Sequence, residues 1–267
     1  MNPIEKYNQR AKKINSLLCV GLDADFEKLP EKFKSLDGSE AQFQFNKYII
    51  DLTHEFVASF KPNVAFYEAR GTEGMEALKK TMDYLHEKYP DIFTILDAKR
   101  ADIGNTNNGY VTSIFDWLGF DAMTINPYLG KEAIQPFLDR KDKASIILCR
   151  TSNSGAGEFQ DLKSDGKYFW EIIAEKVSKE WNQNENCLLV VGATYPEEIK
   201  KIREIVGEMT FLVPGIGVQG GDVKSVVING LNKKKLGLII NSSRGIIFSE
   251  NPAEEAKKLR DEINLYR

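Results

Sequence analysis

The chain is poor in the residues that most often bind zinc or pair as nucleophile and base. It has two histidines, His54 and His86, both in segments expected to be outer helices. It has three cysteines, Cys19, Cys149 and Cys187, which are far apart, lie in or beside apolar runs and form no C-x-x-C pair. Zinc chemistry and Ser-His-Asp hydrolysis therefore lose support. The cysteine pattern is typical of buried, reduced thiols, which predicts a reducing cytoplasm.

Long apolar runs and a strong charge of either sign are also missing. No apolar stretch approaches the ~20 residues that a transmembrane helix needs, and the polar residues 1–6 do not resemble a secretion signal. The formal net charge is -3, which argues against a nucleic acid partner but allows a local basic pocket for an anionic metabolite. We expect a soluble protein that binds neither membrane nor nucleic acid.

Short apolar runs alternate with longer amphipathic segments along the chain. Such alternation predicts a parallel sheet, and about eight units in 267 residues predict a single-domain α/β fold over 1–267, the closed TIM (β/α)₈ barrel. We expect a helix at 3–14 and a polar surface excursion at 24–40. Strands are expected at 17–22, 57–60, 93–96, 122–125, 145–149, 188–191, 211–213 and 238–240. Helices are expected at 41–56, 72–88, 106–118, 130–138, 167–181, 196–206, 222–229 and 252–265.

The run from Asp97 to Asp102 places charge at the tip of the third expected strand. Side chains alternate between the two faces of a strand, so Asp97 and Lys99 point the same way. Inward positions rarely carry charge, because desolvating a charge is costly unless it is paired. An acid and an amine side by side, followed by Asp102, therefore indicate a functional site. In principle Asp97 and Asp102 could also supply oxygens to Mg²⁺.

Polar residues recur where other strands end, and barrels of this type place their active sites at those ends. The exits are Gly21-Leu22-Asp23, Phe60-Lys61-Pro62-Asn63, Arg150 to Gly155, Pro214 to Gly221, and Asn241 to Gly245. The last two suggest a phosphate site, because glycines let the backbone approach an anion and Arg244 can add a charge-assisted contact. The spacing Gly215-x-Gly217-x-x-Gly220 also matches a dinucleotide fingerprint, but it comes late and no ribose-binding acid follows.

Together these motifs resemble a known family. The pattern Asp97-x-Lys99-x-x-Asp102-Ile103-x-Asn105-Thr106 is similar to the signature of orotidine 5′-phosphate decarboxylases, and the other exits match family segments in the same order. The resemblance covers essentially the whole chain. Thr151-Ser152-Asn153 and the length resemble the longer, type 2 branch. The D-x-K-x-x-D core alone is shared with related barrels such as hexulose-phosphate synthases, whereas the extension to Thr106, together with Lys61, is specific.

The resemblance implies a decarboxylation without a cofactor or metal. Orotidine 5′-monophosphate would lose CO₂ to give uridine 5′-monophosphate, the last step of UMP biosynthesis. Lys99 would protonate C6 of the pyrimidine, and Asp97 would lie against the substrate carboxylate. Lys61 and Asp102 would complete an alternating array. Whether Asp97 repels the carboxylate or holds Lys99 charged and oriented stays open at this point.

The resemblance also implies a homodimer with shared active sites, in which Asp102, Ile103 and Thr106 reach into the partner's site. The implied substrate contacts on the same chain are Asp23 and Lys61 for the ribose hydroxyls, with Asn63 nearby. Thr151 and Ser152 would contact the pyrimidine edge, Pro214 would line the pocket, and Gln219 and Arg244 would bind the phosphate. Ser243 stands where many relatives carry glycine, so a backbone contact to phosphate is expected there, with less room for close approach.

Three other interpretations fit parts of the pattern. A metal-dependent aldolase-type barrel acting on a sugar phosphate would lose activity with a chelator. A non-catalytic protein that binds phosphorylated metabolites would bind without turnover, although binding alone does not need Lys99 between two acids. The charged run could also be a buried ion network that holds the third strand, but such networks are weak evidence for stability.

Overall fold

The computed structural model describes residues 2–216 and 221–267. In this part of the chain, eight parallel strands close into a barrel in the order β1-β10-β9-β8-β5-β4-β3-β2. The closed parallel barrel confirms the predicted (β/α)₈ architecture. The strands are β1 Leu18–Val20, β2 Ser59–Phe60, β3 Phe93–Arg100, β4 Ala122–Ile125, β5 Ala144–Arg150, β8 Cys187–Val191, β9 Phe211–Val213 and β10 Leu238–Ser242.

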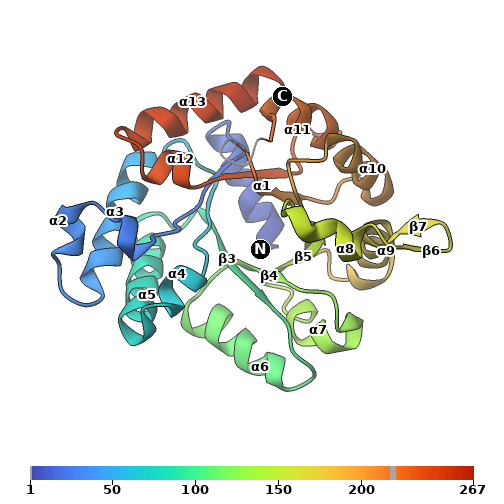
Figure 1. Cartoon of the computed structure of the whole chain (residues 1–267), viewed down its shortest axis with the longest axis horizontal. Coiled ribbons are helices and arrows are strands. Elements are labelled where there is room, and N and C mark those ends of the chain that lie inside the picture. Colours follow the sequence, from blue (N-terminus) through green and yellow to red (C-terminus); the bar gives the residue numbers. More distant parts are fainter. Residues whose placement is uncertain (1, 217–220) are drawn as a thin grey trace.

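Helices surround the barrel (Figure 1). The longer ones are α3 Glu40–Thr53, α5 Gly71–Lys88, α6 Thr106–Val111, α7 Gly130–Leu138, α9 Phe169–Lys176, α10 Pro196–Val206, α11 Val223–Gly230 and α13 Pro252–Leu265. Short helical pieces are η1 Phe26–Lys28, α2 Glu31–Lys34, α4 Ala65–Glu68, η2 Thr112–Trp117, η3 Ser154–Ala156, α8 Gly157–Gln160, η4 Val177–Trp181 and α12 Arg244–Ile247. Outside the barrel, β6 Lys163–Ser164 and β7 Lys167–Tyr168 pair as an antiparallel hairpin.

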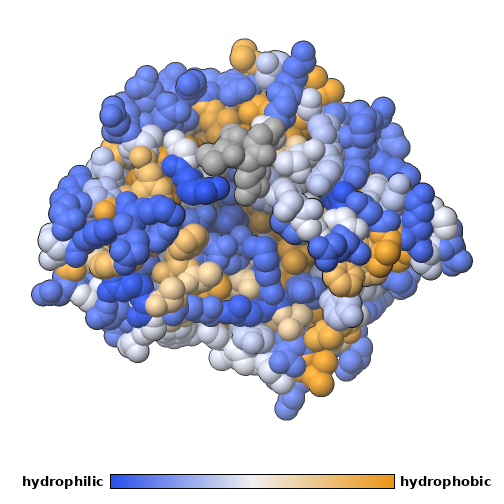
Figure 2. All heavy atoms as spheres, in the orientation of Figure 1, coloured by the Kyte–Doolittle hydropathy of each residue, from blue (hydrophilic) through white to orange (hydrophobic). Residues whose placement is uncertain are grey.

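Helix α1 (Pro3–Lys13) closes the end of the barrel where the strands begin. The hydroxyl of its buried Tyr7 donates to the carbonyl of Leu238, the first residue of β10. Arg10 donates to the carbonyl of Val57, just before β2. With this end covered, the carboxyl ends of the strands form the accessible end. Figure 2 shows a hollow there, at the centre of the face, with many hydrophilic residues around it.

Several predicted bounds are confirmed and others need correction. The helices at 130–138, 196–206 and 252–265 have the predicted bounds. Strand β3 continues to Arg100 instead of ending at Leu96, so Asp97 and Lys99 belong to the strand itself. The first strand is shorter than the predicted 17–22. Segment 24–40 is more than a polar excursion, because it forms η1 and α2 and buries Phe33.

The predicted helices at 106–118 and 167–181 are both interrupted. Each changes from α-helix to π-helix, at Thr112 and at Val177 respectively. The second also starts later than predicted, because residues 167–168 belong to β7. Its start is fixed by Glu171, whose carboxylate accepts the backbone N–H of Tyr168 at 2.8 Å. This contact satisfies a backbone donor at the first turn of the helix.

Candidate active site

A cavity of about 620 Å³ lies at the carboxyl ends of the strands. This volume falls in the range typical of small-molecule sites, ~300–1,000 Å³. The strand exits predicted from the sequence converge on it. The predicted site residues that line it are Asp23, Lys61, Asn63, Asp97, Lys99, Thr151, Ser152, Pro214, Ser243 and Arg244.

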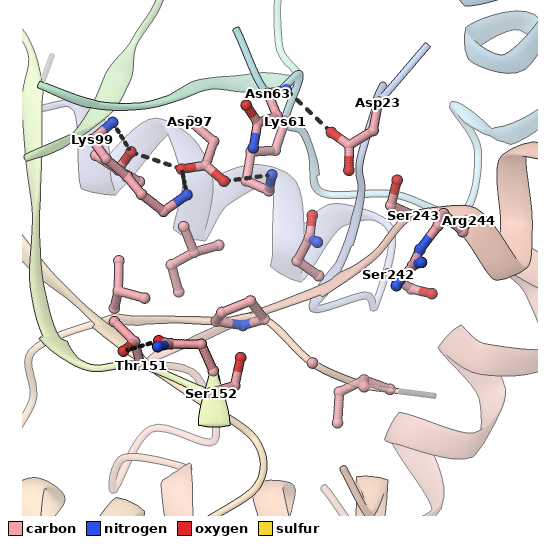
Figure 3. A pocket seen from close by; sticks show the side chains of 18 of the residues that line it. Asp23, Lys61, Asn63, Asp97, Lys99, Thr151, Ser152, Ser242, Ser243 and Arg244 are labelled. Atoms are coloured by element: carbon pink, nitrogen blue, oxygen red, sulfur yellow. Dashed lines mark hydrogen bonds and ion pairs between the residues drawn. The ribbon is translucent and has the colours of Figure 1, made fainter. Parts of the chain in front are cut away.

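Lys61, Asp97 and Lys99 form one continuous ion array in this cavity (Figure 3). Lys61 Nζ lies 3.1 Å from Asp97 Oδ2, and Lys99 Nζ lies 2.7 Å from Asp97 Oδ1. The exposed fractions of the side chains are 4% for Lys61, 13% for Asp97 and 49% for Lys99. A purely structural network would bury all three groups. Here the outermost cation faces the cavity, as a group that meets a ligand must.

The array keeps Asp97 and Lys61 in charged form. Burial alone would raise the pKa of Asp97, but the charges of Lys61 and Lys99 and hydrogen bonds from Lys99 and Thr124 outweigh it, so the pKa lies well below its usual range. Burial would lower the pKa of Lys61, yet Asp97 and Asp23 raise it above the usual lysine value. Asp97 is therefore an anion and Lys61 a cation at neutral pH.

Thr124, on β4, is a site residue that sequence reasoning missed. Its hydroxyl donates to Asp97 Oδ1 at 2.8 Å and accepts the backbone N–H of Lys99 at 2.9 Å. Lys99 has φ +46°, in the left-handed region that side chains other than glycine rarely adopt. The pairing of β3 with β4 shifts register in the same segment. Thr124 thus ties the acid to the strained backbone of the amine.

Asp23 and Asn63 lie beside this array. Asp23 Oδ1 accepts the backbone N–H of Asn63 at 3.1 Å, and Asn63 pairs with Asp97 through an isolated parallel bridge. The Asn63 side chain accepts the N–H of Ala65 at 3.1 Å. The three exits after β1, β2 and β3 are therefore linked through backbone groups, which places the carboxylate of Asp23 next to Lys61, as Figure 3 shows.

Thr151 and Ser152 lie across the cavity from the ion array (Figure 3). Gln160, which also lines the cavity, was not predicted. It bonds Thr151 twice, through the Thr151 backbone N–H at 3.0 Å and the Thr151 hydroxyl at 2.8 Å. Arg150, noted among the polar exit residues, is instead a buried scaffold residue. Its guanidinium pairs with Glu198 at 2.5 Å.

Arg244 lies at the opposite end of the cavity from Lys99, next to Ser242 and Ser243 (Figure 3). Its guanidinium makes no hydrogen bond or ion pair with residues 2–216 and 221–267, so it is available to an anion. The Ser243 hydroxyl donates to the carbonyl of Gly21 at 3.2 Å. A Cβ at Gly21 would lie 2.7 Å from Ser243 Cβ, so glycine at position 21 makes room for the serine.

In the loop after β9, Gly215 has φ +99°, and the N–H of Gly221 donates to the Gly215 carbonyl at 3.1 Å. A Cβ at Gly221 would lie 2.7 Å from that carbonyl oxygen, so the two ends of the loop approach each other only with glycine there. Gln219, predicted to bind phosphate, lies outside the described residues.

Asp102, Ile103 and Thr106 do not line the described part of this cavity. The Asp102 carboxylate accepts the N–H of Ile103 at 2.6 Å, and the Asp102 backbone is held by Asn107. Ile103 is 62% exposed, which is unusual for an isoleucine. Their predicted role in a partner's site stays a prediction. Asp97 lines the cavity and Asp102 does not, so the option of Mg²⁺ on both carboxylates gains no support. Residues 2–216 and 221–267 contain no group of three or more acid, histidine or cysteine side chains suited to a metal.

No helix in residues 2–216 and 221–267 is both long and apolar enough to cross a membrane. The three cysteines are free and buried, as predicted. Burial raises the pKa of the Cys19 thiol to about 12. The thiol is therefore protonated and takes no part in nucleophilic chemistry at neutral pH.

Comparison with known proteins agrees with this geometry. A curated relative from Cellvibrio japonicus, named orotidine 5′-phosphate decarboxylase, is 46% identical over 274 residues and covers 100% of both chains. A relative of the same name from Christiangramia forsetii is 46% identical over 95% of this chain and 92% of its own. The solved structure of Leishmania donovani OMP decarboxylase superposes with a TM-score of 0.89 at 39% identity, covering 100% of this chain and 99% of that one. The family model matches residues 16–259, and the chain belongs to the orotidine 5′-phosphate decarboxylase / HUMPS family.

Proposed function

We propose that this cavity decarboxylates orotidine 5′-monophosphate to uridine 5′-monophosphate and CO₂, the final step of UMP biosynthesis. One observation carries the proposal. Lys61, Asp97 and Lys99 form a single ion array whose outer lysine faces a nucleotide-sized cavity, with Arg244 at the other end (Figure 3). Orotidine 5′-monophosphate carries its reacting carboxylate and its phosphate at opposite ends, as the cations Lys99 and Arg244 lie at opposite ends of this cavity.

The chemistry needs placed charge. Loss of CO₂ from C6 of the pyrimidine leaves an electron pair on an sp² carbon that the ring delocalises poorly. An ammonium group held at C6 stabilises that charge as it develops and then donates its proton to the carbon. We assign this role to Lys99, because its side chain is the half-exposed member of the array. The carbon–carboxylate bond breaks, its electron pair stays on C6, and the Lys99 proton joins it.

Asp97 acts in this proposal by positioning Lys99. Both carboxylate oxygens of Asp97 are engaged, one by Lys61 and the other by Lys99 and Thr124. Such a carboxylate fixes the direction of the Lys99 ammonium group before substrate arrives. Preorganisation of this kind lowers the reorganisation needed at the moment of reaction. This geometry favours orientation over repulsion of the substrate carboxylate.

Substrate contacts follow from the position of each side chain. Asp23, Lys61 and Asn63 would meet the ribose hydroxyls, and Arg244 would pair with the phosphate. Ser152 and Thr151 would face the pyrimidine edge, with Pro214 along the wall. Ile103 and Thr106 would contact the substrate bound by the other subunit. Binding energy at the phosphate can support the chemistry at the distant ring.

We further propose a homodimer in which Asp102, Ile103 and Thr106 serve the partner's site. Exposed apolar side chains follow β3 and β4, namely Ile103, Tyr128 and Leu129. Exposed apolar side chains at the ends of two neighbouring strands support an interface there. Mixing inactive Lys99→Ala with inactive Asp102→Ala subunits tests the sharing. Random reassortment restores about a quarter of the sites if Asp102 acts in trans, and none if it acts within its own chain.

The activity is tested by mixing the protein with orotidine 5′-monophosphate and EDTA and following the ultraviolet change. Turnover that survives EDTA supports the cofactor-independent decarboxylase. Loss of activity with the chelator would favour the metal-dependent aldolase-type reaction, and binding without turnover would favour a binding protein.

Three free, buried thiols support a reducing compartment, the cytoplasm.

A further inference from the structure

The loop between β5 and α9 folds back on itself and closes at its base. It leaves β5 at Arg150, passes through η3 and α8, and returns at Gln160 and Asp161. Two contacts join its ends. The Arg150 guanidinium lies 3.0 Å from Asp161 Oδ1, and the Gln160 amide bonds Thr151. We call the pair Gln160–Thr151 and Arg150–Asp161 the loop clasp.

Gln160 and Asn153 together use both donors of Thr151. The Thr151 backbone N–H donates to Gln160 Oε1 at 3.0 Å, and Gln160 Nε2 donates to the Thr151 hydroxyl at 2.8 Å. The hydroxyl in turn donates to Asn153 Oδ1 at 2.6 Å. A hydroxyl has one hydrogen, so in this arrangement Thr151 offers a ligand no donor. Gln160 therefore fixes the backbone direction in which the chain enters Ser152.

The other half of the clasp is rigid. The Arg150 side chain is 2% exposed, pairs with Glu198 of α10 at 2.5 Å and lies over the Tyr195 ring at 4.3 Å. The loop also packs tightly on the exit of β8. A Cβ at Gly192 would lie 2.9 Å from the backbone nitrogen of Ser152. Beside these contacts, the Gln160 amide holds Thr151 at the wall of the cavity.

We propose that Gln160 is a positioning residue that sets the pyrimidine-facing segment at Thr151 and Ser152, and so determines selectivity for the base. The inference rests on the proposed function of the cavity and extends it to a residue of α8. Gln160 acts through Thr151, on the side of the cavity opposite the ion array (Figure 3). Its loss should weaken recognition of the pyrimidine and leave recognition of the sugar phosphate intact.

The test measures the inhibition constants of two competitive ligands, uridine 5′-monophosphate and ribose 5-phosphate, for the wild-type protein and for Gln160→Ala. The inhibition constant of uridine 5′-monophosphate should rise about tenfold or more, as expected for one to two lost hydrogen bonds. The inhibition constant of ribose 5-phosphate should stay within about twofold, because Arg244 and Asp23 do not depend on the clasp. Gln160→Glu keeps the acceptor for the Thr151 N–H but loses the Nε2 donor. Its inhibition constant for uridine 5′-monophosphate should therefore lie between those of the wild type and Gln160→Ala.

Glu158→Ala is the matched control, since Glu158 is an exposed residue of the same short helix. It should change neither constant. Equal weakening of both ligands by Gln160→Ala would show a general structural role and overturn the inference, and so would no change for either. If Gln160→Ala does not fold, the ligand ratio of Gln160→Glu decides in the same way. Failure of the wild-type protein to turn over orotidine 5′-monophosphate would refute the proposed function itself, which is a separate result.

Discussion

Removing the hydroxyl of Thr124 should damage both stability and turnover. Thr124→Val keeps the shape of a side chain that is 1% exposed. It deletes a hydrogen bond to the ionised Asp97 and leaves the backbone N–H of Lys99 without its acceptor. A hydrogen bond to a charged group contributes ~1.5–3 kcal/mol, and an unpaired buried donor costs ~1–3 kcal/mol.

These terms are not additive, because both bonds meet at one oxygen. We expect the free energy of unfolding to fall by about 2–4 kcal/mol. We expect kcat to fall about 10- to 100-fold, since a small displacement of Lys99 costs heavily in a reaction that depends on placement. Urea unfolding gives the first quantity, and the ultraviolet assay at saturating substrate gives the second.

Thr124→Ser is the control, because it keeps the hydroxyl and should retain most of both quantities. The affinity for uridine 5′-monophosphate should change little in either variant, since Thr124 holds the array and not the product phosphate. A Thr124→Val protein with wild-type kcat would refute the claim that Thr124 positions the Lys99 ammonium group for the reaction. Equal loss in Thr124→Ser would assign the effect to packing.

Two further predictions concern charge. Arg244→Ala should weaken binding of uridine 5′-monophosphate by about 1.5–3 kcal/mol in calorimetry and leave uridine binding unchanged, because the lost contact is charge-assisted and specific to phosphate; unchanged nucleotide binding would contradict the phosphate assignment. The lowered pKa of Asp97 stabilises the folded state above the usual aspartate pKa of ~3.9, and that stabilisation is lost as pH falls. The stability gap between wild type and Asp97→Asn should therefore narrow below about pH 4, and a constant gap would count against an ionised Asp97.

The strand pattern was enough to predict the barrel and the charged residues on one side of the cavity. Lys61, Asp97 and Lys99 stand out because charge at the end of an apolar strand is costly unless it is used. Strand alternation predicts that Asp97 and Lys99 share a face. The actual contact depends in addition on the left-handed backbone of Lys99, which alternation does not predict.

The supporting residues could not be predicted in the same way. Thr124 lies in the run Ala122–Ile125, where a threonine is an ordinary strand residue. Gln160 reaches Thr151 only because the intervening loop turns back, and loop closure leaves no periodic signal. Arg150 looked like a cavity residue beside Thr151, yet its partner Glu198 lies on a helix far along the chain. Long-range pairs of this kind are set by tertiary packing.

The most direct test of the account is the Lys99→Ala variant. The central claim is that the Lys99 ammonium, held by Asp97, supplies the proton at C6. We predict a folded protein that binds uridine 5′-monophosphate and whose turnover of orotidine 5′-monophosphate falls by about 10³-fold or more, since the variant loses both a proton donor and a placed charge. Turnover within about tenfold of wild type in the same ultraviolet assay would contradict the claim.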